Sequence, residues 1–237
     1  MNARLNELSR AEAADRGSAG ALCVLPVGSL EQHGEHLPVG TDSLLVETVV
    51  LRAAGLTCCD VVVAPTVWTG LSAHHVRLGV TVTLEPELLL KLGSSIVGCL
   101  RSWFSQVVIV NGHGGNRGWL GALALIEECP VVSYWELVDP SLLSALFPVD
   151  LGSIGHAGQA ETSAMLAVAP DLVSAGPSAF EPITRANDQL LLPDMGVSGV
   201  LGDPAAASAN AGEQFLDAAS RTLAEFLDIL DHKEFPS

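Results

Sequence analysis

The sequence predicts one α/β domain over residues 1–237, built as a three-layer α/β/α sandwich with a mainly parallel central sheet. Short β-branched, apolar runs alternate along the chain with longer segments of helical periodicity. Strands that are apolar on both faces are typical of a parallel sheet covered by helices, and the β-α-β-α order favours the same architecture. A chain of this length can bury one core without a second domain. Residues 1–18 are expected to form a peripheral or flexible N-terminus.

Four apolar runs have the length and composition of buried strands. They are Ala21–Val27, Val61–Ala64, Val107–Val110 and Val131–Tyr134. None approaches the roughly 20 residues that a membrane-spanning helix needs. Because ligands bind outside the carboxyl ends of parallel strands, the residues that follow each run are the first place to look for a site.

The segments between these runs carry helix signals. Thr41 or Asp42 is expected to cap a helix over Ser43–Ala54 that Gly55 ends, and the acidic segment Glu85–Glu87 is expected to open a helix over Leu88–Phe104. Further helices are expected over Arg117–Glu128, Gln159–Ala167 and Gly212–Leu230. Residues 175–208 hold four prolines and four glycines and predict a long surface excursion rather than an interdomain linker.

The composition excludes several classes of partner. With 27 acidic and 11 basic side chains the formal charge is −16, which would repel nucleic acid and anionic membranes. A hydrophobic fraction of 49% predicts a soluble protein with surface buried between subunits, and hence a homo-oligomer. The polar N-terminus lacks the apolar core of a signal peptide, so we expect a cytoplasmic location. Five cysteines without paired spacing predict buried, reduced thiols.

Metal-ligating side chains crowd the segment after the first predicted strand. Glu31 and His33 are two residues apart, which in an extended segment places both on the same side, and Asp42 at a helix start can turn its carboxylate toward them. His113 follows the third predicted strand. Carboxylates with imidazoles suit Zn²⁺, Mn²⁺ or Fe²⁺, and the absence of a nearby cysteine argues against a structural zinc site. Since an aspartate can bridge two ions, Asp42 is the candidate bridge.

A third segment adds His156 and Glu161, separated by small residues. His156 is the candidate for proton transfer to a leaving nitrogen. A single histidine is more often a structural residue held by hydrogen bonds than a metal ligand. A lone glutamate on a helix is most often exposed to solvent. A structural or solvent role is therefore expected, taken singly, for His74, His75 and His232, and a supporting role beside a ligand for His36.

Three segments together resemble the signatures of the creatininase (creatinine amidohydrolase) family. They are Gly28–Pro38 with Thr41 and Asp42, Asn111–Asn116, and His156–Ser163; the resemblance extends from about Leu22 to Gly212. It implies a three-layer fold, two divalent metal ions per subunit, hydrolysis of a C–N bond and often a hexamer built as a trimer of dimers. It also implies a role for five residues: metal ligation by Glu31, His33, Asp42 and His113, with Asp42 bridging, and proton transfer by His156.

The chain departs from creatininase itself in the second segment. Gly114 and Gly115 stand where creatininase has a tyrosine and a glutamate ligand, and we expect Glu161, which matches a glutamate of the last signature, to replace that ligand. The glycine-rich version is similar to two other branches of the family, the formamidopyrimidine-nucleotide deformylase and the peptidase that trims the mycofactocin precursor. Creatininase itself has aromatic residues that enclose its substrate, and Trp135 is the one that this chain retains. Trp135, His74, Arg77 and Arg117 are the candidates for substrate binding. Arg117 is equally compatible with a charge on a helix surface.

These residues predict a metal-dependent hydrolase in which a hydroxide held between two ions attacks an amide-type carbon while His156 protonates the departing nitrogen. A cyclic amide or formamide ranks first as substrate, a short peptide second and creatinine third. Two alternatives stay open. One is a non-catalytic, metal-stabilised binding scaffold whose excursion over residues 175–208 contacts a partner. The other is hydrolysis of a C–C bond in a sugar or keto compound on the same metal core.

Overall fold

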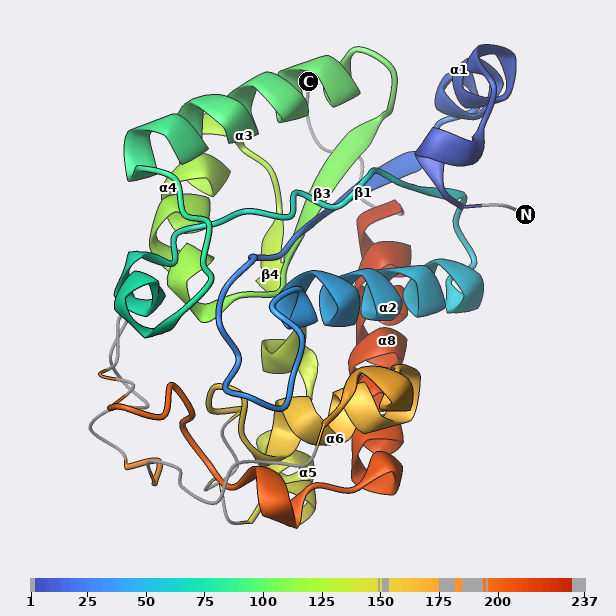
Figure 1. The fold of residues 1–237 in the computed structure, drawn as a ribbon. Helices are drawn as coiled ribbons and strands as arrows, with labels where there is room; N and C mark the ends of the chain where they lie inside the picture. Colours follow the sequence, from blue (N-terminus) through green and yellow to red (C-terminus); the bar gives the residue numbers. More distant parts are fainter. Residues whose placement is uncertain are drawn as a thin grey trace.

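A four-stranded parallel sheet forms the centre of the protein (Figure 1). The computed structural model describes residues 3–148, 150, 154–174, 182–184, 194 and 196–231. In these residues the strand order is β2-β1-β3-β4, and every neighbouring pair is parallel. The strands are β1 (Leu22–Val27), β2 (Val61–Val63), β3 (Gln106–Asn111) and β4 (Val131–Ser133).

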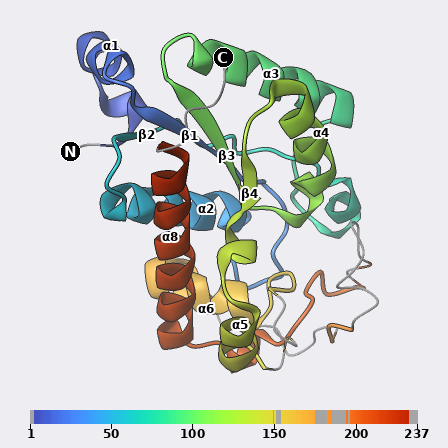
Figure 2. The same cartoon turned by 180° about the vertical axis from the view of Figure 1, so that it is seen from behind.

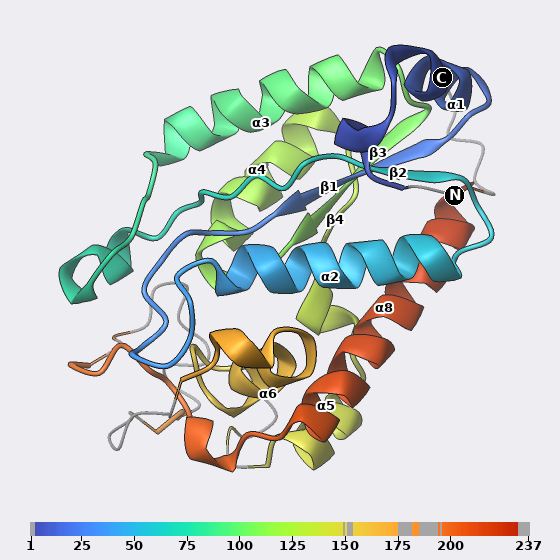
Figure 3. The same cartoon turned by 45° about the vertical axis from the view of Figure 1, so that its right-hand side comes forward.

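Helices cover both faces of this sheet (Figure 3). On one face lie α3 (Pro86–Arg101) and α4 (Arg117–Glu127). On the other lie α2 (Thr41–Leu56), α6 (Gln159–Val168) and α8 (Ala209–Asp231), with α5 (Pro140–Leu146) beyond them. Alternate strand residues feed the two cores, so that Val108 packs with α2 and α8, and Ile109 packs with α3 and α4. The predicted α/β class and mainly parallel sheet are confirmed.

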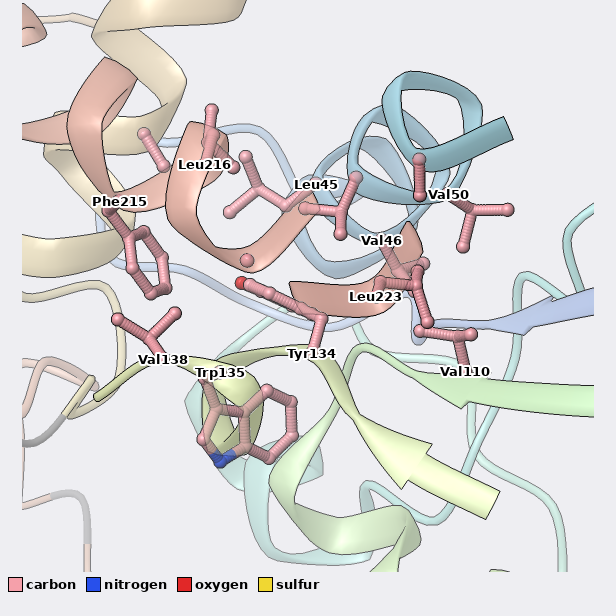
Figure 4. Close-up of a cluster of buried hydrophobic side chains, with 14 of the residues drawn as sticks. Leu45, Val46, Val50, Val110, Tyr134, Trp135, Val138, Phe215, Leu216 and Leu223 are labelled. Atoms are coloured by element: carbon pink, nitrogen blue, oxygen red, sulfur yellow. The ribbon is translucent and has the colours of Figure 1, made fainter. Parts of the chain in front are cut away.

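Close contact between α6 and α8 depends on a glycine. A Cβ at Gly212 would lie 1.9 Å from the carbonyl oxygen of Ser163, so only glycine lets these helix backbones approach as they do. The long helix α8 then runs beside α2 and α6, on the same face of the sheet as these two helices (Figure 2). Figure 4 shows Tyr134 in the core that results, with its ring extending toward Phe215 of α8, whose ring centroid lies 5.8 Å away.

Several predicted boundaries were wrong. α2 begins at Thr41, not Ser43, and its N-cap is Gly40 without a side-chain cap, because the Thr41 hydroxyl donates to the Pro38 carbonyl and the Asp42 carboxylate points elsewhere. Gly55 lies inside α2 rather than ending it. α3 begins at Pro86 and ends at Arg101, short of the predicted Phe104. Half of the predicted excursion over residues 175–208, and His232, lie outside the described residues.

The N-terminal segment is ordered at the periphery (Figure 1). A reciprocal capping box between Ser9 and Glu12 starts α1 (Arg10–Ser18), and Arg16 pairs with Asp60 beside β2. The prediction of five buried thiols was wrong, because Cys58 and Cys99 are exposed; all five cysteines are free. Within the described residues, no helix has the length and apolar character to cross a membrane.

Candidate metal centre

The loops after β1 and β3 bring the predicted ligands together at the carboxyl end of the sheet. Both loops lie close against the start of α2: a Cβ at Gly28 would be 2.4 Å from Ser43 Oγ, and one at Gly112 would be 2.7 Å from Val46 Cβ. The loop after β1 also runs toward α6 before the chain enters α2 (Figures 1 and 3). The five side chains that meet here are each at most 5% exposed: Glu31, His33, Asp42, His113 and Glu161.

These side chains form two groups that share one residue. In the group called site 1, His113 Nδ1 lies 3.2 Å from Glu31 Oε1 and 3.2 Å from Asp42 Oδ2. In site 2, His33 Nε2 lies 3.2 Å from Asp42 Oδ1 and 3.8 Å from Glu161 Oε2. Each group holds three ligand atoms close enough to surround one ion. Asp42 offers a different oxygen to each site, which is the geometry of a carboxylate that bridges two cations.

Three of these atoms lack the partners that buried polar atoms normally have. Glu31 Oε1, His33 Nε2 and Asp42 Oδ2 are fully buried and make no hydrogen bond to any described residue. Buried polar atoms without partners are rare and costly. Each of the three belongs to one of the two groups, and a set of oxygen and imidazole donors is what Zn²⁺, Mn²⁺ or Fe²⁺ prefers. The residues present therefore fit divalent cations.

Protons on His33 and His113 balance the negative charge of the buried carboxylates at the centre. Burial is the largest single influence on the pKa of Glu31 and raises it, but His113 and His75 together lower it to about 2; at Asp42, burial is outweighed by His33 and His113 together, and the pKa is again about 2. In turn, burial lowers the pKa of His33 while Asp42 raises it, to about 10. Burial dominates at Glu161 and raises its pKa to about 7. The buried carboxylates thus demand positive charge, which bound cations would supply in place of protons.

The comparisons with known proteins agree with this geometry. The family profile described as creatinine amidohydrolase matches residues 6–227. The chain belongs to the creatininase family. Among its relatives is a mycofactocin precursor peptide peptidase of Mycolicibacterium smegmatis, 32% identical over 81% of this chain and 78% of the relative. A creatinine amidohydrolase of Pseudomonas putida is 31% identical over 98% and 97%. A solved structure described as creatininase Mn superposes with a TM-score of 0.83 at 26% identity, covering 98% of this chain and all of that one.

Membership makes the protein a metal-dependent amidohydrolase, as the sequence predicted. Hydrogen bonds fix how its candidate ligands face the centre. Ser29 Oγ donates to Glu31 Oε2 at 2.9 Å, and the Ala157 N–H donates to Glu161 Oε2 at 2.5 Å. His33 Nδ1 lies 3.1 Å from the Glu31 carbonyl oxygen, which places the proton on Nδ1 and leaves the lone pair of Nε2 for a cation.

The creatininase-family residue His113 is held in the same way from the other side. Its Nε2 lies 3.2 Å from the Leu71 carbonyl oxygen and 3.2 Å from Ser72 Oγ, so that Nδ1 faces site 1. A Cβ at Gly115 would be 2.5 Å from this Nε2 and 2.2 Å from the Leu71 oxygen, so the chain has no room for a side chain at Gly115. Glu161 groups with His33 and Asp42 in site 2, so its expected role as the ligand that replaces the missing glutamate stays a prediction that this placement permits.

His156 lies outside these two groups, but with Glu31 and His33 it forms a third set of three side chains close enough to hold an ion. Its Nδ1 is 3.6 Å from Glu31 Oε1, and its ring centroid is 4.3 Å from that of His33. Burial, followed by the charge of His33, lowers the pKa of His156 to about 3, so the imidazole is neutral. Its proton-transfer role stays a prediction that this placement permits.

The residues predicted to bind substrate are placed differently from one another. The His74 ring stacks on His113, with centroids 6.0 Å apart. Trp135 is 7% exposed and packs edge-on against Tyr134, in the core rather than in an open pocket, with the Arg117 guanidinium 5.7 Å from its ring centroid. Both arginines already pair with carboxylates at the surface, Arg117 with Glu136 and Arg77 with Asp194. Each guanidinium group therefore already has a carboxylate partner within the protein.

A later segment of the chain closes over this end of the sheet. His156 and Leu201 exchange two main-chain hydrogen bonds, at 2.9 and 2.8 Å. The fully buried Asp150 accepts from the N–H of Gln159 at 2.8 Å and from that of Asp203 at 3.1 Å, and burial raises the pKa of its carboxyl to about 6. The start of α6 and the segment near residue 201 are thereby joined.

Sequence reasoning missed two contacts of the centre. His75, expected to be structural, is 1% exposed and places Nε2 3.3 Å from Glu31 Oε1. Gln32, between two candidate ligands, reaches His75 at 2.8 Å. The tandem His74–His75 pair after a predicted strand was the available signal. His36, expected to support a ligand, pairs its Nε2 with Thr162 Oγ1 at 3.0 Å, on the turn of α6 that carries Glu161.

Proposed function

We propose that the protein hydrolyses an amide-type C–N bond with two divalent cations, one held by Glu31, Asp42 and His113 and the other by His33, Asp42 and Glu161. The observation that carries this proposal is the placement of the two Asp42 oxygens, one in each group. Three buried ligand atoms without hydrogen-bond partners among the described residues support it. When bound, such a pair of cations polarises a carbonyl group and lowers the pKa of a water.

The protein's own residues supply positioning and proton transfer. The neutral His156 presents Nδ1 3.6 Å from Glu31 Oε1, where it can take the proton that water loses and later return it to the departing nitrogen. The buried walls exclude bulk water, which strengthens every electrostatic interaction at the centre. Zn²⁺, Mn²⁺ and Fe²⁺ all suit the donor set, and we propose that the enzyme acts in the cytoplasm as a homo-oligomer.

For the substrate we propose a small cyclic amide or formamide. No unpaired arginine faces the centre among the residues described here, which favours a neutral substrate over an anionic one. A short peptide is the second candidate, supported by the similarity to the mycofactocin precursor peptide peptidase. Creatinine ranks third, because Trp135, the one retained clasping aromatic, is packed in the core.

The first experiment measures metal content by elemental mass spectrometry of protein purified without chelator. Near two ions per chain are expected, falling to one in Glu161→Gln and to none or one in Asp42→Asn. Glu35→Gln, a change at an exposed position of the same loop, is the matched control and should keep both ions. Wild-type protein without bound metal would contradict the proposal.

The second experiment screens cyclic amides, formamides, short peptides and creatinine for hydrolysis. Released amine that is lost in a folded Asp42→Asn variant supports the hydrolase. Two ions per chain without turnover of any substrate would favour the binding scaffold, and product formed without released amine would point to C–C bond hydrolysis.

A further inference from the structure

The Gln32 side chain lies at a junction of three segments that meet beside site 1. Its Oε1 accepts the N–H of Gly34 at 3.0 Å. Its Nε2 lies 3.0 Å from the Gly199 carbonyl oxygen, 2.8 Å from His75 Nδ1 and 3.2 Å from His156 Nε2. The side chain is 6% exposed, so its polar atoms need hydrogen-bond partners within the protein.

These contacts fix which end of the Gln32 amide is the nitrogen. A main-chain N–H can only donate, so the atom that faces Gly34 is the oxygen. A carbonyl can only accept, so the atom that faces Gly199 is the NH₂ group. Both assignments agree, and neither depends on a histidine. The NH₂ group has one further proton to give after the bond to Gly199.

That second proton goes to His75. The alternative acceptor, His156 Nε2, lies 2.9 Å from the main-chain carbonyl oxygen of Gln32, and since a carbonyl accepts, His156 Nε2 must carry its own proton. His75 Nδ1, at 2.8 Å, is therefore the acceptor of the Gln32 amide. A neutral imidazole that accepts at Nδ1 carries its proton at Nε2.

Consequently, His75 faces the metal centre with a hydrogen-bond donor and His156 faces it with an acceptor. His75 presents an Nε2–H group 3.3 Å from Glu31 Oε1, and His156 presents a lone pair on Nδ1 3.6 Å from the same oxygen. Their rings lie side by side, with centroids 4.3 Å apart. The Glu31 oxygen between them accepts no hydrogen bond from a described residue, so the His75 proton is still available.

We propose that Gln32 is a positioning residue that holds His75 as the Nε2–H tautomer, so that His75 is a hydrogen-bond donor for the substrate carbonyl oxygen opposite the proton acceptor His156. This assignment rests on the proposed hydrolysis. As the oxygen of water bonds to the amide carbon, its proton passes to His156 Nδ1, and the carbonyl electron pair moves onto the oxygen that His75 faces. The electron pair on that oxygen then re-forms the carbonyl as the C–N bond breaks, and the nitrogen, which keeps the C–N electron pair, takes the proton from His156.

The test is the protonation pattern of the histidine rings, measured by long-range ¹H–¹⁵N correlation NMR on ¹⁵N-labelled, Zn²⁺-loaded full-length protein. His75→Asn and His156→Asn variants assign the two spin systems. Both histidines are expected to carry the proton on Nε2 in the wild type. A proton on Nδ1 of His75 would overturn the proposal.

The decisive variant is Gln32→Glu, whose carboxylate cannot donate. The proton of His75 is then expected to move to Nδ1, where it can bond to the introduced carboxylate, while that of His156 stays on Nε2 because it bonds to the main chain. An unchanged His75 in a folded Gln32→Glu protein would sink the proposal. If this variant does not fold, Gln32→Met removes the donor without adding charge, and His75 is expected to show a mixture of tautomers instead of one; a single Nε2–H form would count against us.

Two further readouts separate this proposal from the hydrolase assignment. Metal content of Gln32→Glu should stay at the wild-type value, since Gln32 contacts no candidate ligand atom of either site. If a substrate is found, kcat should fall about 10- to 100-fold, the usual effect of losing a residue that orients a metal site, with a smaller change in KM. Absence of any turnover would refute the hydrolase while leaving the tautomer measurement intact.

Discussion

Replacing Gly115 by alanine should uncouple His113 from the metal centre. The new Cβ would lie 2.2 Å from the Leu71 carbonyl oxygen and 2.5 Å from His113 Nε2. Ordinary carbon contacts begin near 3.5 Å, so the Leu71 oxygen and the His113 ring must both move away from residue 115 by roughly 1 Å. These shifts separate His113 Nε2 from the Leu71 and Ser72 oxygens that hold it.

The magnitude follows from these contacts. Overpacking of this kind costs about 1–3 kcal/mol of stability. Loss of the bonds that orient a ligand weakens metal affinity by about 10- to 100-fold. Gly114→Ala is the matched control, because a Cβ at this neighbouring position meets no atom within 4 Å. Isothermal titration of apo protein with Zn²⁺ should show one weakened site in Gly115→Ala and two wild-type sites in Gly114→Ala. Wild-type affinity at both sites of Gly115→Ala would refute the reasoning.

Three further predictions concern stability. Gly212→Ala should destabilise the protein by more than about 3 kcal/mol in urea unfolding, because its Cβ would lie 1.9 Å from the Ser163 oxygen, whereas Gly98→Ala on α3, which meets nothing within 4 Å, should not. Because burial raises the pKa of Asp150 to about 6, above the roughly 3.9 of an unfolded chain, its contribution is fully present below pH 4 and is lost as pH rises through 6. The stability difference between wild type and Asp150→Asn should accordingly fall by about 3 kcal/mol across that window, and a pH-independent difference would contradict this. Chelation of the metal should lower Tm, and Zn²⁺ or Mn²⁺ should restore it; an identical Tm with and without metal would show that the ions do not bind the folded protein.

Much of the fold could be read from the sequence because its signals are local. β1, β2 and β3 are apolar runs buried on both faces, such as Val107–Val110 within β3, and the helices between the strands carry apolar periodicity. The boundaries were less accurate where tertiary contacts compete with local rules. At the start of α2, Thr41 or Asp42 was expected to act as a cap, but the Thr41 hydroxyl donates to the Pro38 carbonyl and the Asp42 carboxylate faces His33 and His113.

The candidate site was only partly accessible from sequence. Glu31, His33, Asp42 and His113 follow strands or open a helix, so their convergence can be anticipated from parallel topology. The sequence could not show which carboxylate belongs to which group, because Glu161 reaches the centre through the packing of α6, which lies far away in sequence. The contact of His75 with the centre was missed for a related reason: its hydrogen-bond partner Gln32 lies 43 positions away in sequence, and the His74–His75 pair carries no signal of that partner.

The bonds that join the early loop to late segments also bear on how the protein acquires its site during folding. Gln32 meets His156 across 124 positions and Gly199 across 167, and contacts between such distant segments form slowly because a long loop must first close. During synthesis, the carboxylates of Glu31 and Asp42 leave the ribosome long before the residues that complete their surroundings. A nascent chain would therefore carry an exposed, acidic half-site, and capture of both ions would be among the last events of folding.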